Sequence, residues 1–504
     1  MKRNVPIARQ ESLVVPDVQN PFVHRLHFGI LDKIQIVIMS VTVAPLRLLM
    51  SGMCLVLAWP LAALSLAFRT EEEKRKPLTG WRKAFSGLLL WLGRCVIFIA
   101  GFHKIKFRGK PASAQDAPVL CAAPHSTFFD TIVCFLGQEL KSPVAKIESS
   151  SLPFLGTLIQ FTQPVFVRRE DPNSRAVTIQ QIRERGQSGG AWPQVLIFPE
   201  GTCTNRSCLI TFKPGAFYPG VPVQPVCLRY FNKLDTFTWT WDGPKAFACL
   251  WYTFCQFNNQ VEIEFLPVYN PSEEEKNDAR LFAHNVRAVM AKHLNCPVTD
   301  HTYDDCRLMV RAARLKLPME AGLVEFQKLH QKLGVNSKQM QGYLEKFCKI
   351  AKSGQINLEE FASYLHLPKS QALEEVFALY DRDNSGTIDF REYVIGLSLV
   401  SGPANSNDTV QFAFQLFDTE NQGHISREGF TQILCNAFKM NTQDVQVLFD
   451  KVDCDNDDKI SFDEFKAYAE EKPEYAKLFK TYHELVQGNG HVENNGTPPK
   501  AKFD

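Results

Sequence analysis

Residues 48–68 form a run of 21 residues without a charged side chain, and this run limits how the first part of the chain can fold. The hydrocarbon core of a bilayer is about 30 Å thick, and about 20 apolar helical residues cross it. Only a helix satisfies the backbone of a single segment there, because no water is available. The run starts too late for a signal peptide. It therefore predicts a membrane-inserted helix, with a buried core helix as the alternative.

A second apolar stretch precedes this run, so we assign the membrane-inserted segment to residues 34–68, after a polar tail over residues 1–33. Pro45 and Pro60 are expected to kink the pair into a re-entrant hairpin. Basic residues flank the segment on both sides, so the positive-inside rule gives no orientation. Residues 69–110 read as a charged linker and an amphipathic helix on the membrane surface. A core helix explains residues 81–102 equally well.

The next region, residues 111–300, has the alternation of an α/β domain. Short β-rich apolar runs occupy residues 119–123, 164–167, 194–198, 223–228 and 261–268, with helix-compatible stretches between several of them. This pattern predicts a sheet flanked by helices. A net charge of +2 gives no nucleic-acid signal. The 14 cysteines form no dense framework, which favours reduced thiols.

His125 and Asp130 follow the first of these strands, at the start of a predicted helix. Histidine is the side chain whose ordinary pKa suits a general base near neutral pH, and a carboxylate can fix its tautomer. Five residues apart within one helix, the two would not face each other. They can meet if His125 lies at the strand end and Asp130 in the first turns of the helix.

Two further groups follow other strands of the predicted sheet. Glu200, Gly201 and Thr202 come after the strand at 194–198, where a glycine permits close backbone approach to a ligand. Arg168 and Arg169 end the strand at 164–167 and could bind phosphate through their planar forks. Each group alone has an ordinary structural explanation. Their convergence at one sheet edge, where α/β sheets bind ligands, favours a functional site.

These motifs together resemble a known family. Residues 125–130, 164–169, 198–205 and 221–226 look like the four ordered motifs of glycerophospholipid acyltransferases. The longer stretches EGTCTNRSCLITFKPGAF and NKLDTFTWTW resemble lysophosphatidylcholine acyltransferases that carry EF-hands, with the type-2 branch closest. The resemblance runs from about residue 20 to about residue 485.

The resemblance implies an O-acyltransferase that uses acyl-CoA or acetyl-CoA as donor. The acceptor would be the free sn-2 hydroxyl of a lysophospholipid, with lysophosphatidylcholine or lyso-PAF as the expected molecule. The reaction would remodel the phospholipids of a membrane lipid bilayer. By the same resemblance His125 is the general base and Asp130 its partner, whereas Arg169 and residues 200–202 bind the acceptor. The expected location is the endoplasmic reticulum membrane, with the Golgi and lipid droplets as further sites. The alternatives are a membrane-anchored calcium sensor with an inactive acyltransferase domain, and a lysophosphatidic-acid acyltransferase.

Residues 341–475 contain four 12-residue loops of the EF-hand type, which start at Lys349, Asp381, Asp418 and Asp453. The second and fourth carry oxygen ligands at the required positions. The predicted Ca²⁺ ligands are Asp381, Asp383, Ser385, Thr387, Asp389 and Glu392 in one loop, and Asp453, Asp455, Asp457, Lys459, Ser461 and Glu464 in the other.

The other two loops lack essential ligands. The loop from Asp418 has Gly429 where a bidentate Glu is needed, and the loop from Lys349 lacks acidic early ligands. Four loops make two pairs, each with one competent member, and calcium is expected to be regulatory. The predicted fold is thus an α/β acyltransferase domain with an N-terminal membrane helix segment, followed by an all-α EF-hand domain. A helical connector at 301–340 joins them, and residues 476–504 form a flexible tail.

Overall fold

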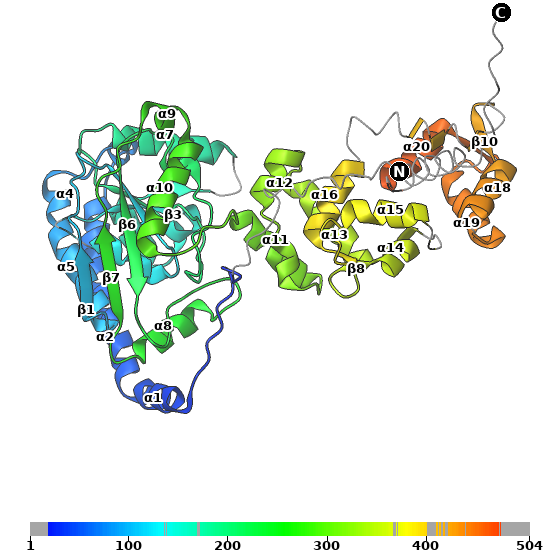
Figure 1. Ribbon diagram of the computed structural model, residues 1–504. Coiled ribbons are helices and arrows are strands. Elements are labelled where there is room, and N and C mark those ends of the chain that lie inside the picture. Colours follow the sequence, from blue (N-terminus) through cyan, green and yellow to red (C-terminus); the bar gives the residue numbers. More distant parts are fainter. Residues whose placement is uncertain are drawn as a thin grey trace, which may run out of the picture. The chain divides into compact units, whose positions relative to one another are not determined.

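The computed structural model describes residues 19–135, 137, 139–168, 172–365, 369, 371–400, 410–411, 413–414, 417–418, 422–438, 440–472 and 474. The described chain divides into two compact units (Figure 1). One, the sheet unit, ends at Cys306, and the other, the helical unit, begins at Arg307. Each is described separately below.

The sheet unit is built on seven strands in the order β1-β7-β6-β2-β5-β3-β4. Their bounds are β1 Lys104–Arg108, β2 Val119–Ala123, β3 Ser142–Lys146, β4 Val165–Val167, β5 Val195–Ile197, β6 Val223–Tyr230 and β7 Gln260–Phe265. Strands β6, β2, β5, β3 and β4 are mutually parallel, and β7 runs antiparallel to β6. The carboxyl ends of five strands therefore lie at one edge of the sheet.

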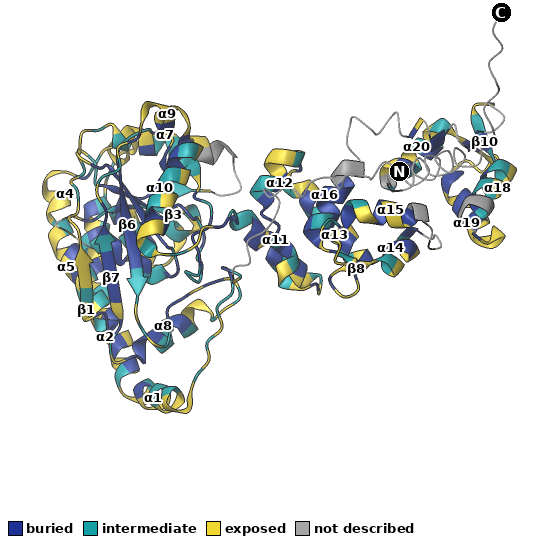
Figure 2. Cartoon of the chain, viewed as in Figure 1, coloured by how far each residue is buried: buried dark blue, intermediate teal, exposed yellow. Residues whose placement is uncertain are grey.

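Strand β2 shows why the sheet has helices on both faces. All five of its residues are buried, as expected for a strand covered on both sides. Val119, Cys121 and Ala123 pack into one apolar cluster, and Leu120 and Ala122 into another. Figure 2 shows the buried strands of the sheet between more exposed helices.

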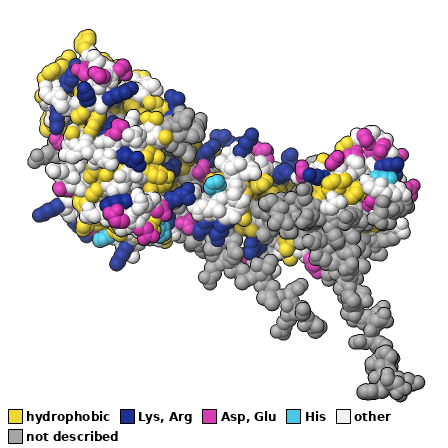
Figure 3. Space-filling model, turned by 90° about the horizontal axis from the view of Figure 1, so that it is seen from above, with side chains coloured by type: hydrophobic (Ala, Val, Ile, Leu, Met, Phe, Trp, Pro, Cys, Tyr) yellow, Lys and Arg dark blue, Asp and Glu magenta, His cyan; other side chains and the backbone are white. Residues whose placement is uncertain are grey.

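The helices of the sheet unit occupy the segments before, between and after the strands. Their bounds are α1 Ile30–Val41, α2 Val43–Leu66, α3 Glu71–Lys74, α4 Gly80–Ala84, α5 Ser86–Ile99, η2 Phe128–Phe135, η3 Ile147–Ser151, α6 Leu155–Phe161, α7 Pro172–Gly186, η4 Pro214–Ala216, α8 Ala246–Phe254, α9 Glu273–Asn277 and α10 Ala279–Leu294. On the face that Figure 3 shows, hydrophobic side chains are interspersed with Lys and Arg.

Within the described residues, α2 alone is long and apolar enough to cross a membrane. Hydrogen bonds join both of its ends to other segments of the sheet unit. Near its start, the buried Arg47 donates hydrogen bonds to the carbonyls of Phe254 and Gln256, at 2.8 and 2.5 Å. At its end, Arg82 donates to the carbonyls of Ser65 and Ala67, at 2.8 and 2.7 Å.

The turn in the apolar segment lies at Thr42, between α1 and α2, and not at a proline. Pro45 occupies the first turn of α2, where the missing N–H costs nothing, and α2 continues through Pro60. The expected surface helix is divided into α4 and α5. Leu89 and Leu90 of α5 are buried in a cluster with residues of α2, whereas Trp91 is exposed, so α5 is a packed helix with one open face.

The N-terminal tail predicted through residue 33 does not extend that far. Phe22 is fully buried, and the amide side chain of Asn205 donates to the carbonyls of Asn20 and Val23, both at 2.9 Å. Residues 19–29 therefore form a segment docked on the sheet unit, and α1 begins at Ile30. The hydrophobic anchor is short, with Pro21 and Phe22 as its buried residues, which is why composition predicted a tail.

The helical unit has its own apolar core. Its elements are α11 Tyr303–Arg314, η5 Met319–Gly322, α12 Phe326–Leu333, α13 Ser337–Ile350, β8 Ile356–Asn357, α14 Leu358–Leu365, α15 Gln371–Tyr380, β9 Thr387–Ile388, α16 Phe390–Val400, β10 His424–Ser426, α18 Arg427–Phe438, α19 Thr442–Val452, β11 Lys459–Ser461 and α20 Phe462–Glu471. Leu308, Phe326 and Leu329 belong to this core, so the region expected as a connector packs as part of the unit.

Candidate functional site

His125 and Asp130 lie together at the carboxyl edge of the sheet. His125 follows β2 in a stretch without regular secondary structure, and Asp130 lies in the first turn of η2, which is a 3₁₀-helix where an ordinary helix was expected. The imidazole Nδ1 is 2.9 Å from the carboxylate Oδ2 of Asp130. The Asp130 side chain is fully buried and that of His125 is 20% exposed. This geometry leaves Nε2 as the ring nitrogen that can accept a proton.

The surroundings of His125 fix its ring and raise its pKa. The ring stacks on Phe198, with centroids 4.2 Å apart and an interplanar angle of 21°. Burial lowers the pKa of His125, but Cys203 and the hydrogen-bonded Asp130 carboxylate outweigh this effect and hold the pKa well above its ordinary value. Both contacts favour the imidazolium, the form that the ring takes after it has accepted a proton.

Glu200 lies beneath His125 and not at an open surface. Its side chain is fully buried, and its carboxylate accepts hydrogen bonds from the backbone N–H of His125 at 2.6 Å and of Ile210 at 3.4 Å. Burial raises the pKa of this carboxyl to about 7. In this arrangement Glu200 supports the backbone at His125, a role that the sequence did not indicate.

Gly201 and Thr202 complete the turn after β5. Gly201 has a φ of +67°, and a Cβ there would approach the Lys213 Cε to 2.9 Å. A left-handed backbone with a lysine stem against it explains why glycine is needed at this position. Thr202 is buried. Lys213 places a positive charge beside the turn. The sequence analysis did not predict that Lys213 lies next to Gly201.

The arginine pair follows β4, the last strand of the sheet. Arg168 is exposed, and Arg169 lies outside the described residues. In the order β2-β5-β3-β4, two strands separate β4 from β2. Neighbouring strands are about 4.8 Å apart, so the backbone at the end of β4 is roughly 14 Å from that at the end of β2. Arginine side chains and a lipid headgroup can bridge such a distance.

The calcium loops are paired as their spacing predicts. Strand β8, in the loop from Lys349, pairs with β9, in the loop from Asp381, and β10 pairs with β11 of the Asp453 loop. Asp381, Asp383 and Glu392 each present a carboxylate oxygen, and these oxygens lie within 4.8 Å of one another.

Asp453, Asp455 and Asp457 present a second such set. At the sixth position of that loop, Asp458 adopts a φ of +60°, so it takes the left-handed conformation usual for glycine. Both sets offer the hard oxygen ligands that Ca²⁺ prefers. Burial and the neighbouring Asp389 and Asp383 raise the pKa of Glu392 to about 7. Such clustering of carboxylates suits the binding of a divalent cation.

Comparison with known proteins gives the family. A family model described as acyltransferase matches residues 104–229, and one described as an EF-hand domain pair matches residues 370–435 and 407–470. Lysophosphatidylcholine acyltransferase 2 of Homo sapiens is 50% identical over 483 residues, or 95% of this chain and 88% of that protein. The chain belongs to the lysophosphatidylcholine acyltransferase family.

Two further members of the lysophosphatidylcholine acyltransferase family are similar over comparable lengths. Lysophosphatidylcholine acyltransferase 2 of Danio rerio is 49% identical over 488 residues, covering 96% of this chain and 92% of that protein. Lysophosphatidylcholine acyltransferase 1 of Mus musculus is 47% identical over 491 residues, covering 97% and 91%. The chain is therefore an acyltransferase with EF-hand domains, as the sequence predicted, and membrane association fits the family and helix α2.

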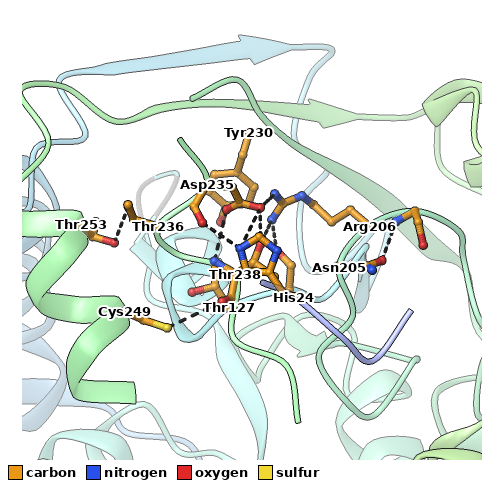
Figure 4. A network of polar contacts seen from close by, with 12 residues as sticks. His24, Thr127, Asn205, Arg206, Tyr230, Asp235, Thr236, Thr238, Cys249 and Thr253 are labelled. Atoms are coloured by element: carbon orange, nitrogen blue, oxygen red, sulfur yellow. Dashed lines mark hydrogen bonds and ion pairs between the residues drawn. The ribbon is translucent and has the colours of Figure 1, made fainter. Parts of the chain in front are cut away.

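The sequence analysis did not predict a second polar cluster, which lies beside the His125–Asp130 pair. Arg206 pairs with Asp235, and it donates to Ser126 Oγ at 2.9 Å and Thr238 Oγ1 at 2.7 Å. Figure 4 shows Arg206 and Asp235 pointing toward each other, with His24 beside them. Arg206 lies in the stretch that carries the family resemblance, and this was the only signal that could have drawn attention to it.

Proposed function

We propose that this acyltransferase moves an acyl or acetyl group from acyl-CoA or acetyl-CoA to the free sn-2 hydroxyl of a lysophospholipid. Lysophosphatidylcholine and lyso-PAF are the proposed acceptors, and calcium is the proposed modulator. The observation that carries the proposal is the His125–Asp130 pair, with 2.9 Å between Nδ1 and Oδ2 at the sheet edge. The names of the relatives support the choice of acceptor.

The chemistry follows from the orientation of the imidazole. The Asp130 carboxylate accepts a hydrogen bond from Nδ1–H, so Nε2 carries the lone pair that removes the proton from the acceptor hydroxyl. The hydroxyl oxygen then attacks the thioester carbonyl, the new C–O bond forms and the C–S bond breaks. The imidazolium returns its proton to the departing thiolate, so the base is regenerated and no covalent acyl-enzyme is needed.

The acceptor's phosphoglycerol part is proposed to bind beside this base. Arg169, Gly201 and Thr202 are the proposed contacts, and the positive φ of Gly201 supports a close backbone approach. Glu200 is proposed to act from beneath, because both of its oxygens already accept backbone hydrogen bonds. The positive charge of Lys213 beside Gly201 favours an anionic group at this turn.

Calcium is proposed to bind the loops Asp381–Glu392 and Asp453–Glu464, through the twelve ligands named above. The clustered carboxylates support this assignment, and the absence of a carboxylate at Gly429 argues against the loop from Asp418. The family resemblance supports a location in the endoplasmic reticulum membrane, with the Golgi and lipid droplets as further sites. Fluorescence microscopy of the tagged chain tests that location.

The deciding experiment compares wild type with His125→Ala in an assay that measures CoA release from acyl-CoA and lysophosphatidylcholine. Loss of the base should lower turnover by about a hundredfold or more. Binding to phosphatidylcholine vesicles should be unchanged, because the imidazole is only 20% exposed. Near-normal turnover in the variant would contradict the mechanism. A panel of lysolipids, including lysophosphatidic acid, then identifies the acceptor.

A further inference from the structure

The carboxylate that orients the catalytic histidine is itself held from two sides. Asp130 Oδ2 accepts hydrogen bonds from His125 and from the backbone N–H groups of Ser126 and Thr127, at 2.7 and 2.9 Å. The other oxygen, Oδ1, accepts a hydrogen bond from the Tyr230 hydroxyl at 2.5 Å. The three groups on Oδ2 belong to the same loop as Asp130. Tyr230 reaches it from β6, 100 residues later.

Tyr230 is held in place by a cluster that includes a charged side chain. It is the last residue of β6, and its ring lies 4.6 Å from that of Phe237. The Arg206 guanidinium lies over the Tyr230 ring at 5.2 Å, and Asp235 pairs with Arg206. A cation over an aromatic face is attracted by the ring, so Arg206 keeps the ring plane fixed. Figure 4 shows Tyr230, Arg206 and Asp235 close together.

We propose that Tyr230 is a positioning residue for acyl transfer, which holds Asp130 in the orientation that His125 needs, and that Arg206 holds Tyr230. The proposal rests on the proposed function of His125. Burying a carboxylate costs free energy when one of its oxygens accepts no hydrogen bond, because the negative charge on that oxygen is then not stabilised. The hydrogen bond from the Tyr230 hydroxyl therefore has two effects: it fixes the plane of the Asp130 carboxylate and stabilises the negative charge on Oδ1.

Removing the Tyr230 hydroxyl has an effect of defined sign. Without that donor, the Asp130 carboxylate becomes a stronger base and favours the imidazolium of His125 more strongly. The neutral imidazole needed for proton removal then forms only at higher pH. Glu200 and Cys203 also face the imidazole, and Arg206 and Asp235 face the tyrosine. These four groups are unchanged in the Tyr230→Phe variant.

The test measures kcat/KM against pH for the full-length protein with acyl-CoA and lysophosphatidylcholine. Tyr230→Phe should lower kcat about tenfold, which is the lower end of the effect of removing a residue that orients a metal-bound histidine. It should also move the acid limb of the kcat/KM profile to higher pH. KM for the lysolipid should not change. The matched control is Tyr269→Phe, since Tyr269 also donates to a carboxylate, that of Glu275, at 2.6 Å and outside the dyad.

Two outcomes would overturn the proposal: a wild-type pH profile and kcat in Tyr230→Phe, or the same changes in Tyr269→Phe. A second variant, Arg206→Lys, keeps the charge but loses the fork. It should also lower kcat. The loss in the double variant with Tyr230→Phe should be smaller than the sum of the two single losses, because part of the effect of Arg206 passes through Tyr230 and the rest through its hydrogen bond to Ser126 Oγ. Fully additive losses would also refute the coupling. Normal turnover in His125→Ala would instead refute the proposed function, so the two failures are distinguishable.

Discussion

Replacing Glu200 by Gln should change how the stability of the sheet unit depends on pH. The Glu200 side chain is fully buried, and burial raises its pKa from the ordinary value of 4.5 to about 7. The folded chain therefore binds this proton more tightly than the unfolded chain. The resulting stabilisation is complete below pH 4.5 and is lost as the pH rises through about 7. The pKa difference corresponds to about 3 kcal/mol.

Gln cannot ionise, yet its amide oxygen can still accept the hydrogen bond from the His125 N–H. The free energy of unfolding of wild type, relative to Glu200→Gln, should thus fall by about 2.5 kcal/mol between pH 5 and pH 8. Denaturation of the detergent-solubilised protein measures this directly. All seven tryptophans lie between Trp59 and Trp251, so intrinsic fluorescence reports the sheet unit and not the helical unit.

The control is Glu274→Gln, because Glu274 is exposed on α9. This variant should follow the wild-type pH dependence. The reasoning is wrong if Glu200→Gln and wild type change in parallel from pH 5 to pH 8. That result would mean that the two backbone N–H groups fully compensate the burial of a charged carboxylate.

Three further changes have expected outcomes. Glu392→Gln and Glu464→Gln should each leave one calcium ion bound by calorimetry, and the double variant none, whereas wild type binds two and keeps basal turnover in chelator. Asp130→Asn should lower kcat by about a hundredfold or more and move the acid limb of the pH profile to lower pH, because the carboxylate raises the pKa of the catalytic imidazole. Phe22→Ala should destabilise the sheet unit by about 3 kcal/mol in tryptophan-monitored denaturation, whereas Phe231→Ala, at an exposed position, should change it little.

Local patterns predicted the parts of the molecule in which interacting residues are close in sequence. His125 and Asp130 are separated by one tight turn, so their approach followed from placing the strand end. The EF-hand pairs followed from the spacing of their loops. Strands β1 and β3 were not predicted: β1 is a short edge strand with three charged residues, and β3 contains a proline. Neither has the apolar run that marked the central strands.

The contacts that sequence did not predict join residues far apart in the chain. Tyr230 meets Asp130 across 100 positions, and the segment that carries the buried Phe22 binds Asn205 more than 180 positions later. Glu200 was expected to contact the acceptor because the family resemblance implies it, and only the fold shows that its carboxylate is buried and accepts backbone hydrogen bonds. Such roles depend on which surfaces come together, and a residue's own type does not reveal them.

The docking of residues 19–29 has a consequence for glycosylation. Asn205 is followed by Arg206 and Ser207, which together form an acceptor sequence for N-linked glycans. The nitrogen that would carry the sugar already donates to the carbonyls of Asn20 and Val23. A glycan replaces one of the two amide hydrogens, so it would remove at least one of these bonds, and its bulk would push the N-terminal segment off the sheet unit. A sugar found on Asn205 would thus identify chains in which this segment had not yet docked, and it would serve as a marker of incomplete folding.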